Sequence, residues 1–316
     1  MSDVNKNNVI CNDPYLTPSM ISSIFDDSIL VDCIYPEYDL LYDCIDQYDA
    51  YFASASVKAD MKLLKKAKRL KVIATPSTGT DHIDRKFAEN HSIQIIDIAK
   101  EYKLLDSFSA TAEMAWCLLL ALIRQLPSAF TDAKQGIWAR QKYTGMQLFG
   151  KTIGIVGFGR LGKMMAQMAK GFRMNVLACD IRPIEEPEVI SVNFDTLLKE
   201  SDIITIHVHL TDQTRNMFSA NVFSKMKDGT FIINTSRGGI INEKALLDAL
   251  YSGKVAGAGL DVICGEWDQD LKKHPLIQYA NMHSNLIISP HIAGSTTESI
   301  ENARVFTAKK LADYLN

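Results

Sequence analysis

Three polar segments place an arginine, a glutamate and a histidine just beyond predicted strands. They are residues 234–239, with Arg237, residues 259–266, with Glu266, and residues 289–295, with His291. Ligands of open parallel sheets bind beyond the carboxyl ends of the strands. A guanidinium can hold a carboxylate, an imidazolium can protonate a carbonyl oxygen, and a nearby carboxylate favours the charged imidazole. Each residue alone has a structural explanation, but together they supply what hydride transfer to a 2-keto acid requires.

A glycine-rich turn within residues 151–162 predicts a dinucleotide site. Gly157 permits the tight turn, Gly159 lets the backbone approach a pyrophosphate, and Gly162 allows close packing of helix on strand. The next predicted strand ends at Asp180, about 20 residues further on, where a carboxylate that binds the ribose is expected. The presence of strand, helix and acid together favours a nucleotide site over a glycine-rich turn that binds nothing.

Composition limits the classes of protein and partner. A chain of 316 residues with 47% hydrophobic content can bury a large core and suggests two domains, and its net charge of −3 argues against a nucleic-acid partner. Residues 58–71 are strongly basic, but Met61, Leu64 and Ala67 recur at helical spacing. The lysines of this segment are therefore predicted to form a solvated helix face.

The cysteines and the apolar runs predict a cytoplasmic protein. Six cysteines show neither CxxC spacing nor clustering with histidines, so neither a metal site nor a disulfide framework is predicted. The first residues are polar and show no signal-peptide pattern. The longest apolar run, Met114–Ile123, is shorter than a bilayer span, and no membrane partner is expected.

Short apolar runs alternate with helical patterns in two successive stretches. The first stretch has predicted strands near residues 9–11, 50–53, 71–74 and 93–96, and the second near 153–156, 176–179, 203–207, 231–234, 255–260 and 286–288. This pattern predicts two α/β domains, each with an open, doubly wound parallel sheet. Residues 296–315 predict a final helix.

A long apolar segment separates the two stretches. Residues 111–126 predict one helix that ends at Pro127. Because its apolar residues lie nearly all the way round, we expect it to be buried against the second domain or against another subunit.

From about Lys71 to its end, the sequence resembles the D-isomer-specific 2-hydroxyacid dehydrogenases. The motifs that carry the resemblance are Thr78-Gly-Thr-Asp-His-Ile-Asp84, Ala112-Glu113, the turn 157–162, His207-Val-His-Leu-Thr211, residues 234–239, Asp261 and Pro290-His-Ile-Ala-Gly294. The resemblance implies that Arg237, Glu266 and His291 are the catalytic residues.

The resemblance also implies a site for NAD and a site for a small 2-hydroxy or 2-keto acid. The implied cofactor-binding residues are Gly157, Gly159, Arg160, Leu161 and Gly162 at the pyrophosphate, Asp180 at the adenosine ribose, Thr235 and Asp261 at the nicotinamide, and His207 and Thr211 along the cleft. The substrate carboxylate would be held by Arg237 and by backbone amides around Ser77, Thr78 and Gly79.

The family fold implies a particular domain division. A Rossmann-type nucleotide domain, residues 106–293, would be inserted in a flavodoxin-like substrate domain made of residues 1–105 and 294–316. The family also implies a homodimer formed through the nucleotide domain and its connecting helix.

The residues around the predicted substrate site bear on two classes of substrate. The motif around His291 is closest in wording to the phosphoglycerate dehydrogenase branch, which makes D-3-phosphoglycerate an alternative substrate. That branch commonly carries an arginine just before the segment corresponding to residues 54–56, and another ahead of the carboxylate loop. This chain has Ala53 and Thr75 there, and a phosphate dianion requires charged donors. We therefore expect a small unphosphorylated acid of the glyoxylate or hydroxypyruvate kind.

Two alternative functions are a regulatory role and formate oxidation. Some relatives serve as NADH-sensing corepressors or scaffolds and keep the same three residues. Related formate dehydrogenases pair the histidine with glutamine, which Glu266 disfavours here. The chain also departs from the family with His209 in place of proline, and with Trp267 and Asp268 after Glu266, where proline is usual.

Overall fold

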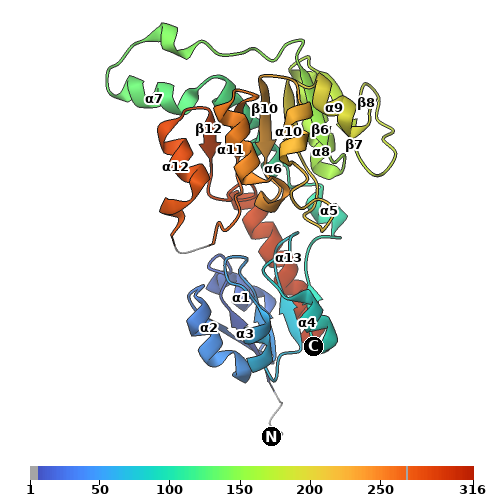
Figure 1. The fold of residues 1–316 in the computed structure, drawn as a ribbon. Helices are drawn as coiled ribbons and strands as arrows, with labels where there is room; N and C mark the ends of the chain where they lie inside the picture. Colours follow the sequence, from blue (N-terminus) through green and yellow to red (C-terminus); the bar gives the residue numbers. More distant parts are fainter. Residues whose placement is uncertain (1–5, 268–269) are drawn as a thin grey trace, which may run out of the picture. The chain divides into compact units, whose positions relative to one another are not determined.

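The computed structural model describes residues 6–267 and 270–316, which fold into two compact units (Figure 1). Unit 1 consists of the described residues up to Phe108 together with Ser295–Asn316, and unit 2 consists of Ser109–Gly294. The chain therefore leaves unit 1, forms all of unit 2, and returns to complete unit 1. The boundaries expected from the sequence were 105/106 and 293/294.

Unit 1 is built on a five-stranded parallel sheet. Its strands, in spatial order, are β2 (Ile29–Cys33), β1 (Asn7–Cys11), β3 (Ala50–Phe52), β4 (Val72–Ala74) and β5 (Gln94–Ile96). This is the 2-1-3-4-5 order of flavodoxin-like folds. One face is covered by α1 (Pro18–Ile24) and α13 (Thr297–Leu315), and the other by α2 (Tyr38–Cys44), α3 (Met61–Lys66) and α4 (Arg85–Asn90). A short helix, α5 (Tyr102–Leu105), precedes the exit from this unit.

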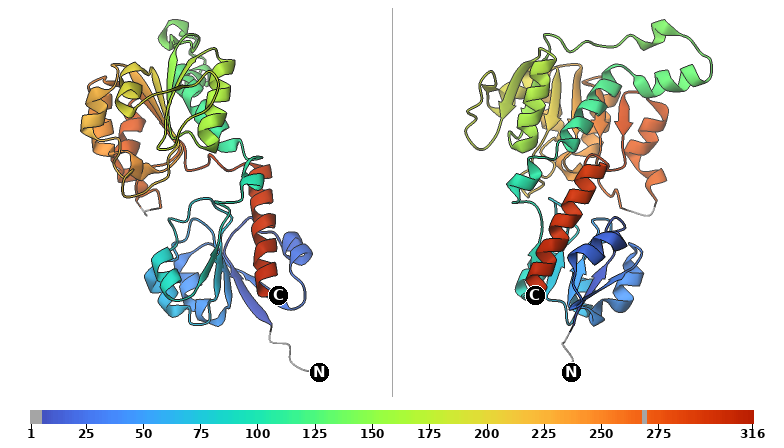
Figure 2. Two further views of the ribbon diagram at one scale, coloured as in Figure 1. Left: turned by 90° about the vertical axis from the view of Figure 1, so that its right-hand side faces the viewer. Right: turned by 180° about the vertical axis from the view of Figure 1, so that it is seen from behind.

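The last helix of the chain is part of unit 1. Figure 2 shows α13 lying along the amino-terminal sheet, and it packs beside α1. Thr296 caps its first turn by accepting a hydrogen bond from the N–H of Ser299. Arg304 donates from Nε and Nη2 to the two carboxylate oxygens of Asp13, at 2.9 Å each. This paired, largely buried ion pair joins the two ends of the chain.

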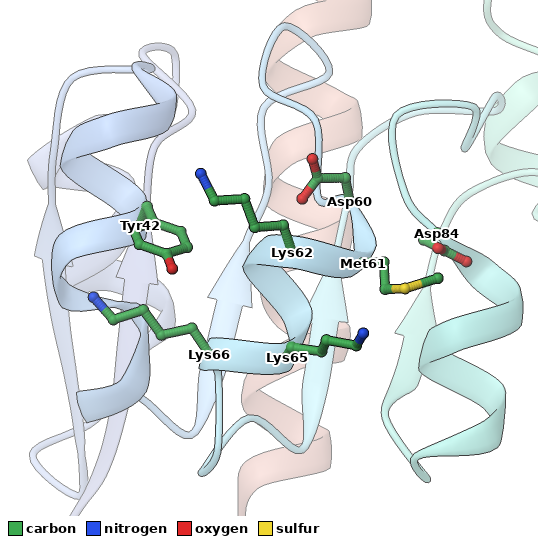
Figure 3. Close-up of a pocket in the computed structure, with 7 residues that line it drawn as sticks. All are labelled: Tyr42, Asp60, Met61, Lys62, Lys65, Lys66 and Asp84. Carbon is green, nitrogen blue, oxygen red and sulfur yellow. The ribbon is translucent and has the colours of Figure 1, made fainter.

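The basic segment of unit 1 lies at its surface, as predicted, and Leu64 and Ala67 are buried, but Met61 of the same predicted face is exposed. Met61 is 47% exposed, and Leu63 and Leu64 are the buried residues of α3. The Nζ atoms of Lys62 and Lys66 lie 4.7 and 4.6 Å from the ring centroid of Tyr42. Figure 3 shows these side chains along a shallow surface hollow.

Unit 2 is built on a seven-stranded parallel sheet. Its strands, in spatial order, are β12 (Leu286–Ile288), β11 (Val255–Leu260), β10 (Thr230–Asn234), β9 (Ile203–Ile206), β6 (Thr152–Val156), β7 (Asn175–Cys179) and β8 (Ile190–Ser191). Numbered within the unit, the order is 3-2-1-4-5-6 plus one further strand, which is the Rossmann arrangement. The order reverses between β6 and β9, and ligands of such sheets bind at this switch point.

Helices cover both faces of the larger sheet. One face packs against α6 (Ala110–Ile123) and α8 (Arg160–Gly171). The other packs against α9 (Phe194–Glu200), α10 (Ala220–Lys225), α11 (Glu243–Tyr251) and α12 (Pro275–Met282). The predicted fold class, two doubly wound α/β domains with one inserted in the other, is confirmed.

The segment predicted as a single helix is two helices. α6 ends at Ile123, and α7 (Leu126–Lys134) begins after Gln125, whose φ is +52°. Pro127 therefore lies in the first turn of α7 instead of ending a helix. A proline is tolerated there because the first N–H groups of a helix have no partner within it.

The apolar character of α6 is explained by unit 2 itself. Eight of its residues are buried, and they pack against β10, β11 and α8 of the same unit. Of the two predicted alternatives, burial against the second domain is therefore the one that the structure confirms. By length and composition alone, Tyr102–Ile123 could cross a membrane, although the longest uninterrupted apolar run within it is Met114–Ile123. The core packing of α6 accounts for this hydrophobicity.

Candidate active site

The glycine turn joins β6 to α8 at the switch point of the larger sheet. Gly157 has a φ of +91°, and a Cβ there would lie 2.6 Å from the carbonyl oxygen of His207. A Cβ at Gly162 would collide with the carbonyl of Gly157. At Gly159 the nearest atom to such a Cβ is Nη2 of Arg182, 3.9 Å away. The outer glycines are thus required by packing, whereas the middle one borders open space.

The amino terminus of α8 follows this open space. Gly159 is its N-cap residue, and Arg160, Leu161 and Gly162 form its first turn. The N–H groups of a first helical turn have no partner within the helix and carry a positive partial charge. The turn therefore offers an anion the kind of site that a pyrophosphate uses.

Asp180 follows β7 and is tied to the glycine turn. Its carboxylate accepts hydrogen bonds from the backbone N–H of Phe158 at 2.6 Å and of Arg182 at 2.9 Å. Burial raises the pKa of Asp180, but these two N–H donors and the charge of Arg182 outweigh it and lower the pKa overall. A charged carboxylate thus lies beside the turn, where the sequence predicted a ribose contact.

Two buried polar atoms on neighbouring strand ends have no partner among the described residues. His207, after β9, shares a hydrogen bond of 2.8 Å between Nε2 and Oγ1 of Thr205, but its Nδ1 is buried and unpaired. Thr235, after β10, has a buried and unpaired Oγ1. An unsatisfied buried polar atom costs about 1–3 kcal/mol. Both residues were predicted to face the cofactor, and a bound ligand would supply the missing partners.

Burial lowers the pKa of His207 from 6.5 to about 4. Below pH 6.5 the unfolded chain therefore binds this proton more readily than the folded protein does. The contribution of His207 to the unfolding free energy is complete above pH 6.5 and is lost as the pH falls towards 4. Between pH 7 and pH 5 we expect a loss of about 2 kcal/mol in unfolding free energy from this residue. Urea unfolding at pH 7 and at pH 5 measures this loss. The loss should be absent in His207→Gln and present in His209→Gln. An equal loss in all three proteins would contradict this.

The predicted residues of the substrate loop and Thr211 have simpler surroundings. Thr211 is exposed, and its N–H donates to Oγ1 of Thr214 at 2.8 Å in a local turn. Ser77, Thr78 and Gly79 follow β4 in unit 1. Within the part of the chain that the structure describes, the backbone N–H groups of these three residues donate to no acceptor. These are the N–H groups that the family resemblance assigns to the substrate carboxylate.

The segment that carries Arg237 is held by Asn234, the last residue of β10. The buried side chain of Asn234 accepts a hydrogen bond from the N–H of Ser236 and donates one to the carbonyl of Arg237, both at 3.0 Å. A Cβ at Gly238 would collide with the backbone of Ile263. The arginine segment is therefore packed against the segment that leads to Glu266.

The two remaining predicted catalytic residues are in direct contact. Nδ1 of His291 lies 2.7 Å from Oε1 of Glu266. An Nδ1–H donated to the carboxylate leaves Nε2 as the nitrogen that exchanges protons with a substrate. Among the described residues, none hydrogen-bonds to Nε2 of His291. Glu266 and His291 are 25 residues apart in sequence, but they meet because their segments follow the neighbouring strands β11 and β12.

Asp261 holds the backbone of the histidine segment. It is fully buried and accepts hydrogen bonds from Oγ of Ser289 at 2.6 Å and from the N–H groups of Ile292 and Ala293 at 3.0 and 2.8 Å. His291 has a φ of +53°, a left-handed conformation that is costly for a residue with a side chain. The sequence placed Asp261 at the nicotinamide, and the structure adds a role in imposing this conformation.

Glu243 and His274 fix the segment of Glu266 and were not predicted from the sequence. Glu243 accepts a hydrogen bond from the N–H of Cys264 at 2.7 Å, and Nε2 of His274 lies 3.1 Å from the carbonyl oxygen of Cys264 and 3.3 Å from Glu243. Nδ1 of His274 accepts from the N–H of Leu276 and caps α12. Both backbone groups of Cys264, two residues before Glu266, are thereby held. In the sequence, an acid at the start of α11 and a histidine just before α12 give no sign of this contact.

A cavity of about 550 Å³ reaches the acid–imidazole pair from the side of α12. Its lining includes Glu266, Trp267 and His291, and the other lining residues come mostly from α12, β12 and the first turn of α7. The Trp267 and His291 rings lie 5.9 Å apart. Trp267 thus occupies the place where a proline was expected, while Asp268 lies outside the described residues.

Glu266→Gln should keep the contact with His291 but remove the charge that favours imidazolium. We expect the rate of keto-acid reduction to fall off at a lower pH than in the wild type, because the neutral amide no longer favours the protonated imidazole. Initial rates of NADH oxidation between pH 5 and pH 9 measure this. An unshifted profile would exclude Glu266 from the proton transfer.

The chain is similar to several known proteins. Residues 116–293 match the family model of the D-isomer specific 2-hydroxyacid dehydrogenase NAD binding domain. A D-3-phosphoglycerate dehydrogenase of Archaeoglobus fulgidus is 37% identical over 273 residues, which cover 85% of this chain and 50% of that protein. A hydroxypyruvate reductase of Thermotoga maritima is 35% identical over 276 residues, which cover 87% of each.

A solved structure is similar over nearly the whole length. The crystal structure of an Aquifex aeolicus D-lactate dehydrogenase, complexed with NAD and lactic acid, has a TM-score of 0.84 and 29% identity. The similarity covers 98% of this chain and 95% of that one. By contrast, the chain spans about half the length of the phosphoglycerate dehydrogenase it matches.

Proposed function

Because this chain belongs to the D-isomer-specific 2-hydroxyacid dehydrogenase family, we propose that it interconverts a small unphosphorylated D-2-hydroxy acid and its 2-keto acid with NAD. Glyoxylate and hydroxypyruvate are the proposed kind of keto acid. The observation that carries the reaction is the 2.7 Å contact between Glu266 and His291, which leaves Nε2 as the acid. NAD, when bound, accepts or supplies the hydride.

Each catalytic residue has one task in this proposal. Arg237 holds the substrate carboxylate and polarises the carbonyl through its paired donors. His291 gives the proton of Nε2 to the carbonyl oxygen as the hydride reaches carbon, and it takes that proton back in the reverse direction. Glu266 stabilises the imidazolium. The free amides of residues 77–79 would bind the carboxylate of the substrate.

The residues that would hold NAD fit its parts. The open side of Gly159 and the first turn of α8 suit the pyrophosphate, and the charged Asp180 suits the ribose diol. The unpaired atoms of His207 and Thr235 suit the polar groups near the nicotinamide.

The preference for an unphosphorylated acid rests on side chains of unit 1. Ala53 and Thr75 are both fully buried, and Oγ1 of Thr75 lies 3.3 Å from Nε2 of His82. Arg85, the cation close in sequence to the carboxylate loop, is engaged by Asp97 at 3.0 Å and by Thr80 at 2.9 Å. A phosphate dianion needs charged donors to offset the cost of removing it from water.

The decisive experiment is a panel of 2-keto acids, with and without phosphate, followed by NADH absorbance. We expect glyoxylate or hydroxypyruvate to give a higher kcat/KM than 3-phosphohydroxypyruvate. A higher value for the phosphorylated acid would support the alternative, a D-3-phosphoglycerate dehydrogenase. Turnover of no acid in the panel would favour the NADH-sensing corepressor or scaffold.

We further propose that the protein is a cytoplasmic homodimer. Helix α7, which the structure describes in full, buries none of its nine residues. It and the following loop extend away from the sheet of unit 2 (Figure 1), and Phe130, Ile137, Trp138 and Phe149 are exposed, Trp138 at 86%. Asp132 orders this arm by accepting hydrogen bonds from Lys142 and Tyr143. An ordered arm with apolar side chains suits a second copy of the chain.

Sedimentation velocity at micromolar concentration is expected to give twice the chain mass of 35.3 kDa. Trp138→Ser should weaken the association, because it removes the most exposed aromatic of the arm, whereas Tyr35→Ser, at an exposed site in unit 1, should not. A monomeric wild type would contradict the proposed dimer and leave the proposed chemistry untouched.

A further inference from the structure

Two cysteines that are 22 residues apart in sequence are neighbours in unit 1. Cys11 ends β1 and Cys33 ends β2, and the parallel register pairs them directly. Partners in adjacent strands lie about 4.8 Å apart. This falls within the range of roughly 4.4–6.8 Å between the Cα atoms of disulfide-bonded cysteines. The backbone at this point therefore already has a separation that a disulfide requires.

Both side chains point to the same face of the sheet. Cys11 belongs to the core under α1 and α13, together with Ile29 and Val31 of β2. Side chains alternate along a strand, so Cys33 lies on the same face as Ile29 and Val31. Cys11 is buried, whereas Cys33 is exposed and ends the edge strand of the sheet. One thiol is thus reachable by a small molecule and the other only by its neighbour.

We propose that Cys11 and Cys33 are an oxidation site for hydrogen peroxide. The sulfur of Cys33 attacks one oxygen, the O–O bond breaks, and hydroxide leaves as water after taking a proton, so that Cys33 becomes a sulfenic acid. The sulfur of Cys11 then attacks Sγ of Cys33. The S–O bond breaks, and the hydroxyl leaves with the proton of Cys11 as a second water. Two electrons pass from the two thiols to the peroxide, and a reversible disulfide joins β1 to β2.

The electrostatics of the pair favour Cys33 as the attacking sulfur. A hydrogen bond with Cys11 lowers the pKa of Cys33 to about 7, against the opposing effects of burial and of the Asp32 carboxylate. The same hydrogen bond, together with burial, raises the pKa of Cys11. Near neutral pH, Cys33 is therefore substantially ionised while Cys11 keeps its proton. This difference assigns the attack to Cys33 and the closing step to Cys11.

Another exposed cysteine of the chain serves as an internal comparison. Burial and the charge of Glu243 raise the pKa of Cys264 to about 11. The larger thiolate fraction of Cys33 outweighs its lower intrinsic nucleophilicity. At pH 7 we expect Cys33 to react on the order of 10- to 100-fold faster than Cys264.

The test uses the reduced full-length protein with hydrogen peroxide at pH 7. After alkylation under denaturing conditions and proteolysis, mass spectrometry should find a peptide pair linked through Cys11 and Cys33, and dithiothreitol should release it. In Cys11→Ser the link should be absent, and dimedone should instead trap a sulfenic acid at Cys33. Cys117→Ser, which removes a different exposed thiol, should leave the link intact.

Two results would overturn the proposal. One is the absence of the linked pair in the wild type while Cys33 is consumed, because Cys11 would then not close the disulfide. The other is a reaction of Cys33 no faster than that of Cys264. If the Cys11→Ser variant fails to fold because that position is buried, the exposed Cys33→Ser variant gives a second test. In native Cys33→Ser, hydrogen peroxide should leave Cys11 unmodified. The proposal does not depend on the proposed dehydrogenase reaction.

Discussion

Replacing His291 with alanine is expected to lower kcat of keto-acid reduction by about 100- to 10,000-fold, the contribution of a well-placed general acid. The imidazole lies 2.7 Å from Glu266 and is the group that presents a proton at Nε2. The binding of NADH should change little, because the cofactor-binding residues lie on other strand ends of the same sheet. Steady-state rates and NADH fluorescence titration measure the two effects separately.

The left-handed backbone of His291 requires a second variant. Alanine is poorly tolerated at a φ of +53°, so His291→Ala could lose activity through a rearranged loop. Asparagine adopts this conformation readily, and His291→Asn removes the acid while the Asp261 contacts remain. Both variants should be equally impaired, whereas the exposed His209→Asn should stay near wild type. Activity within tenfold of the wild type in His291→Asn would show that another group supplies the proton.

Much of this site could be predicted from the sequence because parallel sheets place strand ends together. The glycine turn, Asp180, Arg237 and the Glu266–His291 pair each follow a strand whose apolar residues are plain in the sequence. What the strand pattern does not contain is contact between loops. The contacts of Glu243 and His274 with the backbone of Cys264 depend on how the first turns of α11 and α12 pack near that loop. No periodicity in the sequence shows these contacts.

The elements that were missed or misplaced each have a physical reason. Strand β2 was not predicted because it lies at the sheet edge, where only Ile29 is buried and Asp32 interrupts a short apolar run. The break between α6 and α7 depends on the left-handed Gln125, a conformation that no residue type there demands. Met61 was predicted on the buried face of α3, but Leu63 is buried and Met61 is exposed. Because both residues are apolar, the sequence does not distinguish them. Missing β2 also hid the pairing of Cys33 with Cys11.

Changing Asp180 to asparagine is expected to narrow the preference for NADH over NADPH by on the order of 100-fold in kcat/KM, because a like charge facing the 2′-phosphate costs several kcal/mol. The carboxylate is charged and lies beside the turn through its bond to Phe158. Asparagine retains one oxygen for the N–H of Phe158, so the turn is kept. The change should therefore arise mainly from better use of NADPH.

A matched variant separates charge from packing. Arg182 lies 3.5 Å from the Asp180 carboxylate and is the cation that would soften its repulsion of a phosphate. Arg182→Ala should widen the preference for NADH, in the direction opposite to Asp180→Asn, while the turn remains as it is. Initial rates with both cofactors at saturating keto acid give two specificity constants, one for NADH and one for NADPH, for each protein. Equal use of NADH and NADPH by the wild type would remove Asp180 from cofactor recognition, as would a preference that Asp180→Asn leaves unchanged.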